Sequence, residues 1–224
     1  MAPPTSRPSL PPGPALRDLS PMVLATGRPF SHPDWIYEVK MDGYRLLAEW
    51  DANGAYLQSR NGADATRWFP EITTALAGVD GGRFVTDGEV CVVDDIGRSD
   101  FSRLHARARM RGYRPGADLV AYFVFDLLVD SGKSVMGLPL AERKNRLAKL
   151  FRGKPPSILV VGAIDTQGEA LYSQALALKL ERIVAKRKDS TYTPGVRTTS
   201  WLKIKRPGGT PAQRFDREPI EPFG

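Results

Sequence analysis

The sequence predicts an α+β fold made of largely antiparallel sheets flanked by helices. Strand-like segments outnumber helix-like segments, and they come in adjacent pairs near both ends of the body of the chain. Adjacent strands are typical of antiparallel sheets, whereas a doubly wound parallel sheet alternates strand and helix. The composition, with 42% apolar and 25% charged residues, is that of an ordinary globular protein.

Apolar residues that alternate with polar ones predict the strands. The predicted strands are 35–41, 44–50, 55–59, 83–93, 120–128, 158–161, 182–188 and 200–205. Helix-like spacing gives four further segments, at 67–78, 100–110, 139–151 and 168–179. In the third of these, Pro139 and Glu142 suit a first helical turn, and the end is basic, as the helix dipole favours.

The two ends of the chain differ in composition from its body. Residues 1–20 carry six prolines and predict an extended arm. Residues 208–224 are rich in Pro and Gly and predict a tail. A single domain is therefore expected over residues 21–207.

Composition excludes several classes of function. With one cysteine, Cys91, the chain forms no internal disulfide and has no cysteine cluster for zinc. The presence of only two histidines argues against histidine-based metal or triad chemistry. No apolar run approaches the roughly 20 residues of a membrane span, and the N-terminus lacks a signal-peptide core. A cytoplasmic monomer is expected, and its net charge of +7 favours a polyanionic partner.

The segment YEVKMDGYR places Lys40 in a predicted strand, just before an Asp42-Gly43 pair that favours a tight turn. A strand lysine usually faces solvent, but the pattern K-x-D-G-x-R suits a nucleophile. An amine attacks phosphorus only when neutral, and burial or nearby cations such as Arg45 or a metal ion lower its pKa.

Other segments carry related chemistry. Arg60 precedes an Asn-Gly turn, and Glu89 follows Asp-Gly, where it is either a turn acid or a ligand for a sugar or a metal. Phe125, in a nearly continuous apolar run, either packs in the core or stacks on a base. Lys203 and Lys205 share one strand face, where like charges repel unless an anion lies between them.

The stretch FSRLHARARMRGYRP is rich in arginine and has no acid. Arg103 and Arg107 share a helix face at i, i+4, and Arg109 and Arg111 follow them. The alternatives are a solvated helix face and a contact with a nucleic-acid backbone that tolerates any sequence. The overall charge favours the nucleic acid.

The order of motifs E-V-K-M-D-G-Y-R, S-R-N-G, D-G-E-V, F-D-L-L, E-R-I-V-A-K-R and W-L-K-I-K resembles the adenylation domain of ATP-dependent DNA ligases. It is most similar to the bacterial ligase domain of non-homologous end joining, from about Ser20 to Pro207. The resemblance implies a nucleotidyltransferase (ATP-grasp-like) fold, with ATP and Mg²⁺ or Mn²⁺ as cofactors. It also implies DNA and other end-joining proteins as partners, near the bacterial nucleoid.

The resemblance also implies roles for residues. Lys40 would attack the α-phosphate of ATP and hold AMP, with Asp42 and Gly43 shaping the turn beside it. Glu38 would lie near the adenine amino group, and Phe125 would stack on the adenine.

The remaining implied roles concern phosphates, the ribose and the metal. Arg45 and Arg60 would contact phosphates, Arg60 also on DNA, and Glu89 would bind the ribose. Glu181, with Glu89, would hold the metal ion. The α-phosphate would be bound by Lys186, Lys203 and Lys205.

The sequence departs from the family pattern at two places. Arg182 stands where the family usually has glycine, beside the nucleotide. Residues 206–224 are too few for the oligonucleotide-binding (OB-fold) barrel that follows the last lysine motif in such ligases. These departures favour an alternative, a ligase relative that binds DNA ends or a repair partner without sealing, whereas the intact set of lysines and acids favours the enzyme. A third interpretation, RNA capping or RNA ligation, uses the same lysine motif and fits the flanking stretches less well.

Overall fold

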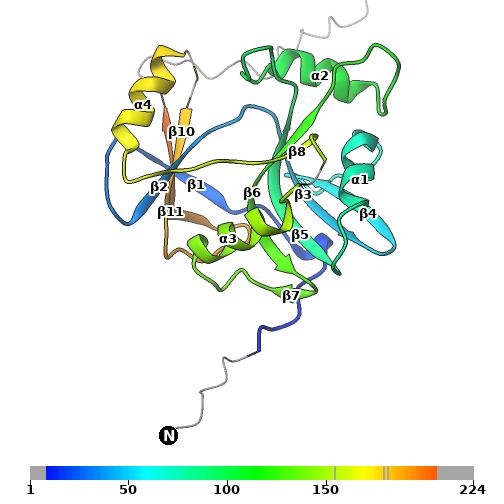
Figure 1. Ribbon diagram of the computed structural model, residues 1–224, viewed down its shortest axis with the longest axis horizontal. Coiled ribbons are helices and arrows are strands. Elements are labelled where there is room, and N and C mark those ends of the chain that lie inside the picture. The colour runs from blue at the N-terminus through cyan, green and yellow to red at the C-terminus, as the bar shows by residue number, and fades with distance from the viewer. Residues whose placement is uncertain (1–8, 154, 179, 181, 206–224) are drawn as a thin grey trace, which may run out of the picture.

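Two mixed sheets, faced by helices, make up the fold in a computed structural model that describes residues 9–153, 155–178, 180 and 182–205 (Figure 1). The predicted tail and Glu181 lie outside the described residues, as do residues 1–8 of the predicted arm. No described helix is long and apolar enough to cross a membrane.

The larger sheet has six strands and contains the central part of the sequence. Its strand order is β4-β3-β5-β6-β7, and β8 pairs with β6. The strands are β3 (Tyr44–Asp51), β4 (Gly54–Ser59), β5 (Phe84–Cys91), β6 (Ala121–Asp130), β7 (Lys133–Ser134) and β8 (Ile158–Val160). All these pairs are antiparallel except β6 with β8.

The second sheet joins the two ends of the described chain. Its strand order is β1-β11-β10-β2-β9, antiparallel except for β1 with β11. The strands are β1 (Val23–Gly27), β2 (Trp35–Val39), β9 (Ile164–Asp165), β10 (Arg182–Arg187) and β11 (Arg197–Lys205). Largely antiparallel sheets confirm the predicted fold class, and β1, β7 and β9 are strands that the sequence pattern does not reveal.

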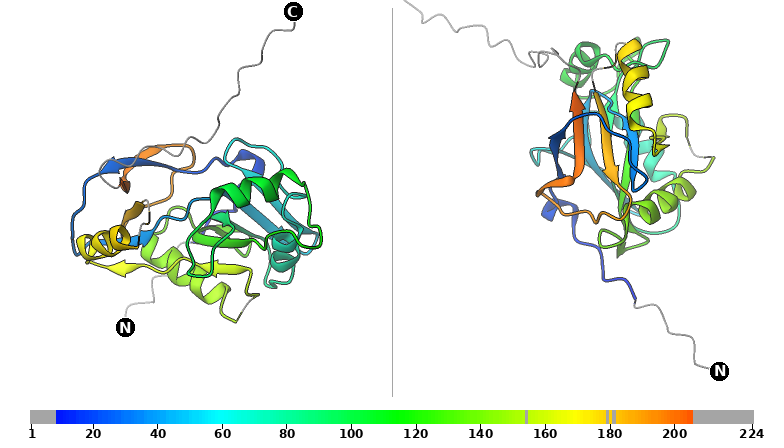
Figure 2. Two further views of the ribbon diagram at one scale, coloured as in Figure 1. Left: turned by 90° about the horizontal axis from the view of Figure 1, so that it is seen from above. Right: turned by 90° about the vertical axis from the view of Figure 1, so that its left-hand side faces the viewer.

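In the described part of the chain, four α-helices pack against the two sheets (Figure 2). They are α1 (Pro70–Ala77), α2 (Phe101–Arg109), α3 (Leu140–Leu150) and α4 (Gly168–Ala177), preceded by the short 3₁₀ helix η1 (Leu16–Asp18). Each α-helix lies within a predicted helical segment. The Asp100 side chain caps α2 by accepting a hydrogen bond from the Arg103 backbone N–H at 3.0 Å.

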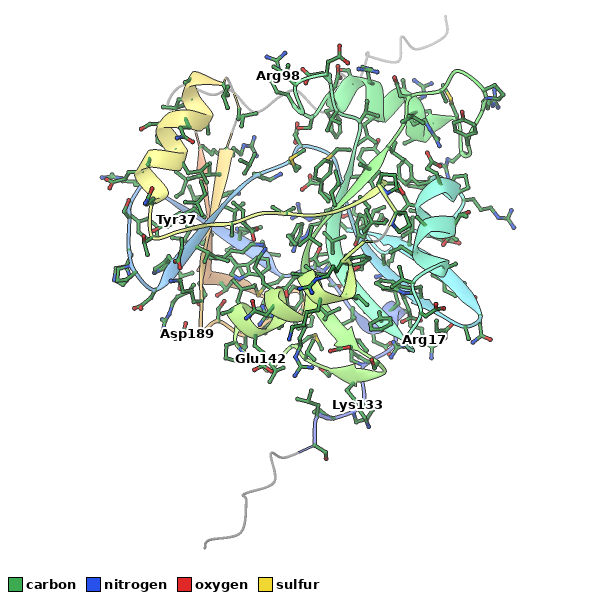
Figure 3. All side chains as sticks on the ribbon, viewed as in Figure 1. Arg17, Tyr37, Arg98, Lys133, Glu142 and Asp189 are labelled. Atoms are coloured by element: carbon green, nitrogen blue, oxygen red, sulfur yellow. The ribbon has the colours of Figure 1, made fainter. Side chains whose placement is uncertain are left out.

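Apolar side chains form three clusters, one on each sheet and one between the sheets. The cluster between the sheets packs Leu47, Val85 and Leu128 of the larger sheet against Trp201 of the smaller sheet. Tyr37 is fully buried between its sheet and α4, whereas Arg98 and Lys133 lie at the periphery (Figure 3). The middle cluster fixes how the two sheets face each other, and this decides which polar side chains meet.

Candidate active site

A cavity of about 750 Å³ is lined by residues of both sheets and of α2. Several residues that line the cavity are cross-strand neighbours, because the strand register pairs them. Glu38 of β2, Val184 of β10 and Lys203 of β11 pair across the smaller sheet, and all three line the cavity. On the larger sheet, Arg45 of β3 pairs with Glu89 of β5.

Lys40 lies just after β2, which ends at Val39, so its predicted position inside a strand is wrong. Its backbone N–H still donates to the Arg182 carbonyl at 3.1 Å, and the chain then leaves the sheet. The Lys40 ammonium is part-buried in the cavity and donates to the Met41 carbonyl at 2.8 Å. The interpretation of Lys40 as an ordinary solvent-facing lysine is therefore not supported.

Glu89 lies beside Lys40. Its Oε1 atom is 3.5 Å from Lys40 Nζ and accepts a hydrogen bond from the Gly43 N–H at 2.9 Å. A Cβ atom on residue 43 would lie 2.1 Å from the Val90 carbonyl oxygen, so only glycine lets the chain approach β5 this closely. Asp42 does not line the cavity.

The Asp87-Gly88 pair runs through the interior of β5, as the predicted strand over 83–93 requires, so the alternative of Glu89 as a turn acid is not supported. Glycine is required there because the Tyr122 ring crosses residue 88, and a Cβ atom would lie 2.4 Å from it. Asp87 is the important residue that sequence reasoning missed. Its carboxylate receives two hydrogen bonds from Arg45, at 3.0 and 2.7 Å, and one from the Tyr192 hydroxyl at 2.7 Å.

These contacts fix Arg45 in the cavity wall. Burial alone would lower the pKa of the Arg45 guanidinium, but the Asp87 carboxylate outweighs burial and the pKa is raised. The positive charge of Arg45 is therefore permanent and largely balanced by Asp87. The Arg45 guanidinium also lies 5.4 Å from the centre of the Phe125 ring.

Glu38 is buried between two lysines. Its Oε2 atom is 2.6 Å from Lys186 Nζ, and its Oε1 atom accepts from Lys144 of α3, a residue that no sequence motif singles out. Burial would raise the pKa of Glu38, but the two ammonium groups outweigh burial and lower it. Burial is also the main reason why the pKa of Lys186 is lowered.

Lys186 is held between two aromatic rings. Its ammonium lies 4.4 Å from the centre of the Phe125 ring and 4.2 Å from that of Trp201. Phe125 packs at the edge of the cluster between the sheets and also lines the cavity, so stacking on a base stays a prediction.

Cations gather at one wall of the cavity. Arg60, Arg182, Arg197 and Lys203 all line it. Partial burial is the main cause of a lowered Lys203 pKa, and the nearby Lys205, Arg197, Arg182 and Arg60 lower it further. Lys205 is exposed and does not line the cavity. These cations repel one another, and a bound polyanion such as a phosphate chain would relieve that repulsion.

The arginine-rich helix needs one correction. Arg107 is 1% exposed, and its guanidinium pairs with Glu71 at 2.6 Å and donates to the Trp68 and Gly112 carbonyls. Arg107 therefore joins α2 to α1 and is not a DNA contact. Arg103 is exposed and pairs with Asp118, while Arg109 and Arg111 line the cavity.

An aromatic wall that sequence reasoning also missed is formed partly by α2. It consists of Tyr44, Trp68, Phe101 and His105, all of which line the cavity. The Tyr44 hydroxyl and His105 Nδ1 are 2.6 Å apart, and Arg111 lies over the Trp68 ring at 4.8 Å.

Among the described residues, the carboxylates that line the cavity and could hold a metal ion are those of Glu38 and Glu89. Within the described ranges, no three His, Cys, Asp or Glu side chains gather into a metal site. Glu181, predicted to hold metal, lies outside those ranges. Glu89 fits a Mg²⁺ ion that keeps most of its ligands from substrate phosphate and water, because such ions need only one or two protein carboxylates.

Comparisons with known proteins show which family the chain resembles in sequence and in fold. Residues 22–205 match the family model of the ATP dependent DNA ligase domain. The multifunctional non-homologous end joining DNA repair protein LigD of Mycobacterium tuberculosis is 32% identical over 190 residues, which cover 84% of this chain and 24% of that protein. LigD of Pseudomonas aeruginosa is 35% identical over 174 residues, covering 77% of this chain and 20% of that protein.

Two solved structures are similar in fold. The ligase domain of M. tuberculosis LigD has a TM-score of 0.73 and 31% identity, covering 85% of this chain and 60% of that chain. Mycobacterial DNA ligase D complexed with ATP and MES has a TM-score of 0.74, also at 31% identity, covering 85% and 61%. The chain thus spans 20–24% of the length of these LigD proteins.

Proposed function

Because the chain belongs to the ATP-dependent DNA ligase domain family, we propose that it transfers AMP from ATP to Lys40 and acts in sealing DNA strand breaks. The observation that carries this proposal is the position of Lys40. Its amine lies beside Glu89, in a cavity that is also lined by Arg60, Arg182, Arg197 and Lys203. A nucleophile, an acid and phosphate-binding cations are the groups that nucleotidyl transfer requires.

In the proposed reaction, the neutral Lys40 amine attacks the α-phosphorus of ATP. An N–P bond forms, the bond to the oxygen that bridges to the β-phosphate breaks, and pyrophosphate leaves with that electron pair. The Lys40 amine loses one proton, and Glu89 Oε1, at 3.5 Å, is placed to accept it. Lys186 and Lys203 stabilise the charge that develops on the α-phosphate.

Other residues of the cavity orient the nucleotide. Glu38 and Phe125 lie together at the Lys186 end, which suits the adenine. When bound, a Mg²⁺ ion held mainly by substrate phosphate and water beside Glu89 would neutralise phosphate charge. Arg60, Arg109 and Arg111 would then contact the DNA backbone.

Intact mass spectrometry tests this proposal. Incubation with ATP and Mg²⁺ should add one AMP, pyrophosphate should remove it, and Lys40→Ala should abolish it. A folded chain that carries no AMP beforehand and gains none would contradict the proposal.

A second candidate is a module that binds DNA ends without chemistry. Arg182 and Arg197 favour it, because both line the cavity and add positive charge that would attract phosphate whether or not the reaction takes place. Two results together would support this candidate. The unmodified chain would form no AMP adduct, and both it and the Lys40→Ala variant would bind DNA.

A further inference from the structure

Lys144 of α3 lies behind the cavity wall and contacts two residues that line it, Glu38 and Val161. Its ammonium is bound to Glu38 Oε1 and donates to the Val161 carbonyl at 3.1 Å. Lys144 does not itself line the cavity, whereas Glu38, Val161 and Lys186 do. The Lys144 side chain is 14% exposed, so the pair is largely shielded from water.

The charges of Glu38, Lys144 and Lys186 do not balance. One carboxylate, Glu38, faces two ammonium groups, and both Glu38 and Lys186 are 2% exposed. The group therefore carries one surplus positive charge beside the cavity. If Lys144 were absent, Glu38 and Lys186 would form a neutral pair, and an incoming phosphate would compete with Glu38 for a single ammonium.

The proposed role of Lys186 requires it to move away from Glu38. Contact with the α-phosphate of ATP would take the Lys186 ammonium from a carboxylate that now lies 2.6 Å away. A buried carboxylate that loses its partner is strongly destabilised. A second cation that stays on the carboxylate removes most of that penalty.

We propose that Lys144 is a positioning residue that keeps Glu38 paired and oriented while Lys186 transfers to the α-phosphate of ATP. This inference rests on the proposed function. Lys144 touches neither the cavity nor the reacting atoms, and its effect on the reaction passes through Glu38.

The test compares Lys144→Met with two variants. Lys149→Met is the matched control, because Lys149 is exposed on the same helix. Lys144→Arg keeps the charge and should restore function. The first readout is the rate of Lys40–AMP formation in a single turnover. The second is the affinity for ATP by calorimetry in the Lys40→Ala background, which needs no adduct.

Lys144→Met should lower the rate or the ATP affinity by about tenfold or more, as expected when a buried charge loses a partner. Lys149→Met should leave both unchanged, and Lys144→Arg should recover most of the loss. In a Glu38→Gln background, where the side chain at position 38 carries no charge, Lys144→Met should change either readout by less than about twofold.

Three results would overturn the inference. In the first, Lys144→Met has the same rate of adduct formation and the same ATP affinity as the parent. In the second, Lys144→Met lowers the rate or the affinity just as much in the Glu38→Gln background, which would mean that Lys144 acts on ATP directly. A loss that tracks a lower urea midpoint, and that is absent in a folded Lys144→Gln variant, would show a purely structural role. A parent chain that binds no ATP would instead remove the proposed function, and this inference with it.

Discussion

The guanidinium of Arg143 pairs with the carboxylate of Asp126, and both side chains are fully buried. Two hydrogen bonds of 2.8 Å join them, from Nε to Oδ1 and from Nη2 to Oδ2. Arg143 Nη1 also donates to the Leu138 and Ser190 carbonyls. One residue of α3 thus holds β6 and the segment that leads into β11, and so helps to fix the two sheets around the cavity.

Arg143→Met should destabilise the protein by about 3–5 kcal/mol, because it leaves the Asp126 carboxylate buried without its partner. Urea unfolding would measure the change, with the exposed Arg152→Met as control. The double variant Arg143→Met, Asp126→Leu should lose less stability than the single one. A single variant as stable as the control would show that the pair is not needed.

Gly43→Ala should destabilise the protein by about 1–3 kcal/mol and sharply reduce adduct formation, because the added methyl group would overlap the Val90 carbonyl and shift Lys40 relative to Glu89. Urea unfolding and intact mass would report the two effects. Gly137→Ala is the matched control, since a Cβ atom there meets nothing within 4 Å. Equal behaviour of the two variants would rule out the close approach as the reason for glycine.

Glu89→Gln should slow AMP transfer by about a hundredfold while the fold is kept. The amide oxygen still accepts from the Gly43 N–H, but the side chain beside Lys40 no longer carries a negative charge. Quench-flow followed by mass measurement gives the rate, and circular dichroism checks the fold. An unchanged rate would exclude Glu89 as the proton acceptor.

Replacing Arg109 and Arg111 by Gln should weaken DNA binding and lower the slope of log affinity against log salt concentration by about 1 for each phosphate that is no longer neutralised. Fluorescence anisotropy at several salt concentrations would measure it. Arg114→Gln is the control, because Arg114 is exposed but does not line the cavity. Arg107→Gln should instead reduce stability, because Arg107 is buried against Glu71.

Glu38 makes stability depend on pH. Its pKa is lowered from an ordinary value of 4.5, so the carboxylate contributes stability above pH 4.5 and loses it as the pH falls through the lowered value. The stability difference between the parent and Glu38→Gln should therefore be largest near neutral pH and shrink below pH 4.5. Urea unfolding from about pH 3 to about pH 7, at about one pH unit per step, would measure it. A difference that stays constant over that range would be the contrary result.

Local patterns in the sequence determined the α+β class, the four helices and most of the strands, because alternation and helical spacing depend on near neighbours alone. They also selected Lys40, Glu89, Lys186 and Lys203, whose motifs are short and contiguous. The residues that hold these groups in place were not predictable in this way. Asp87 resembles a turn acid in its local sequence, and Arg107 resembles one more exposed arginine.

Only the tertiary structure decided which charges are buried and which partners they meet. Lys144 and Glu38 lie 106 residues apart, and Arg45 and Asp87 lie 42 apart. These pairs form because the apolar cluster between the sheets fixes the register and facing of strands that are distant in sequence. The proposed nucleophile is thus contained in a short motif, whereas the charge balance around it arises from the packing of segments that are distant in sequence.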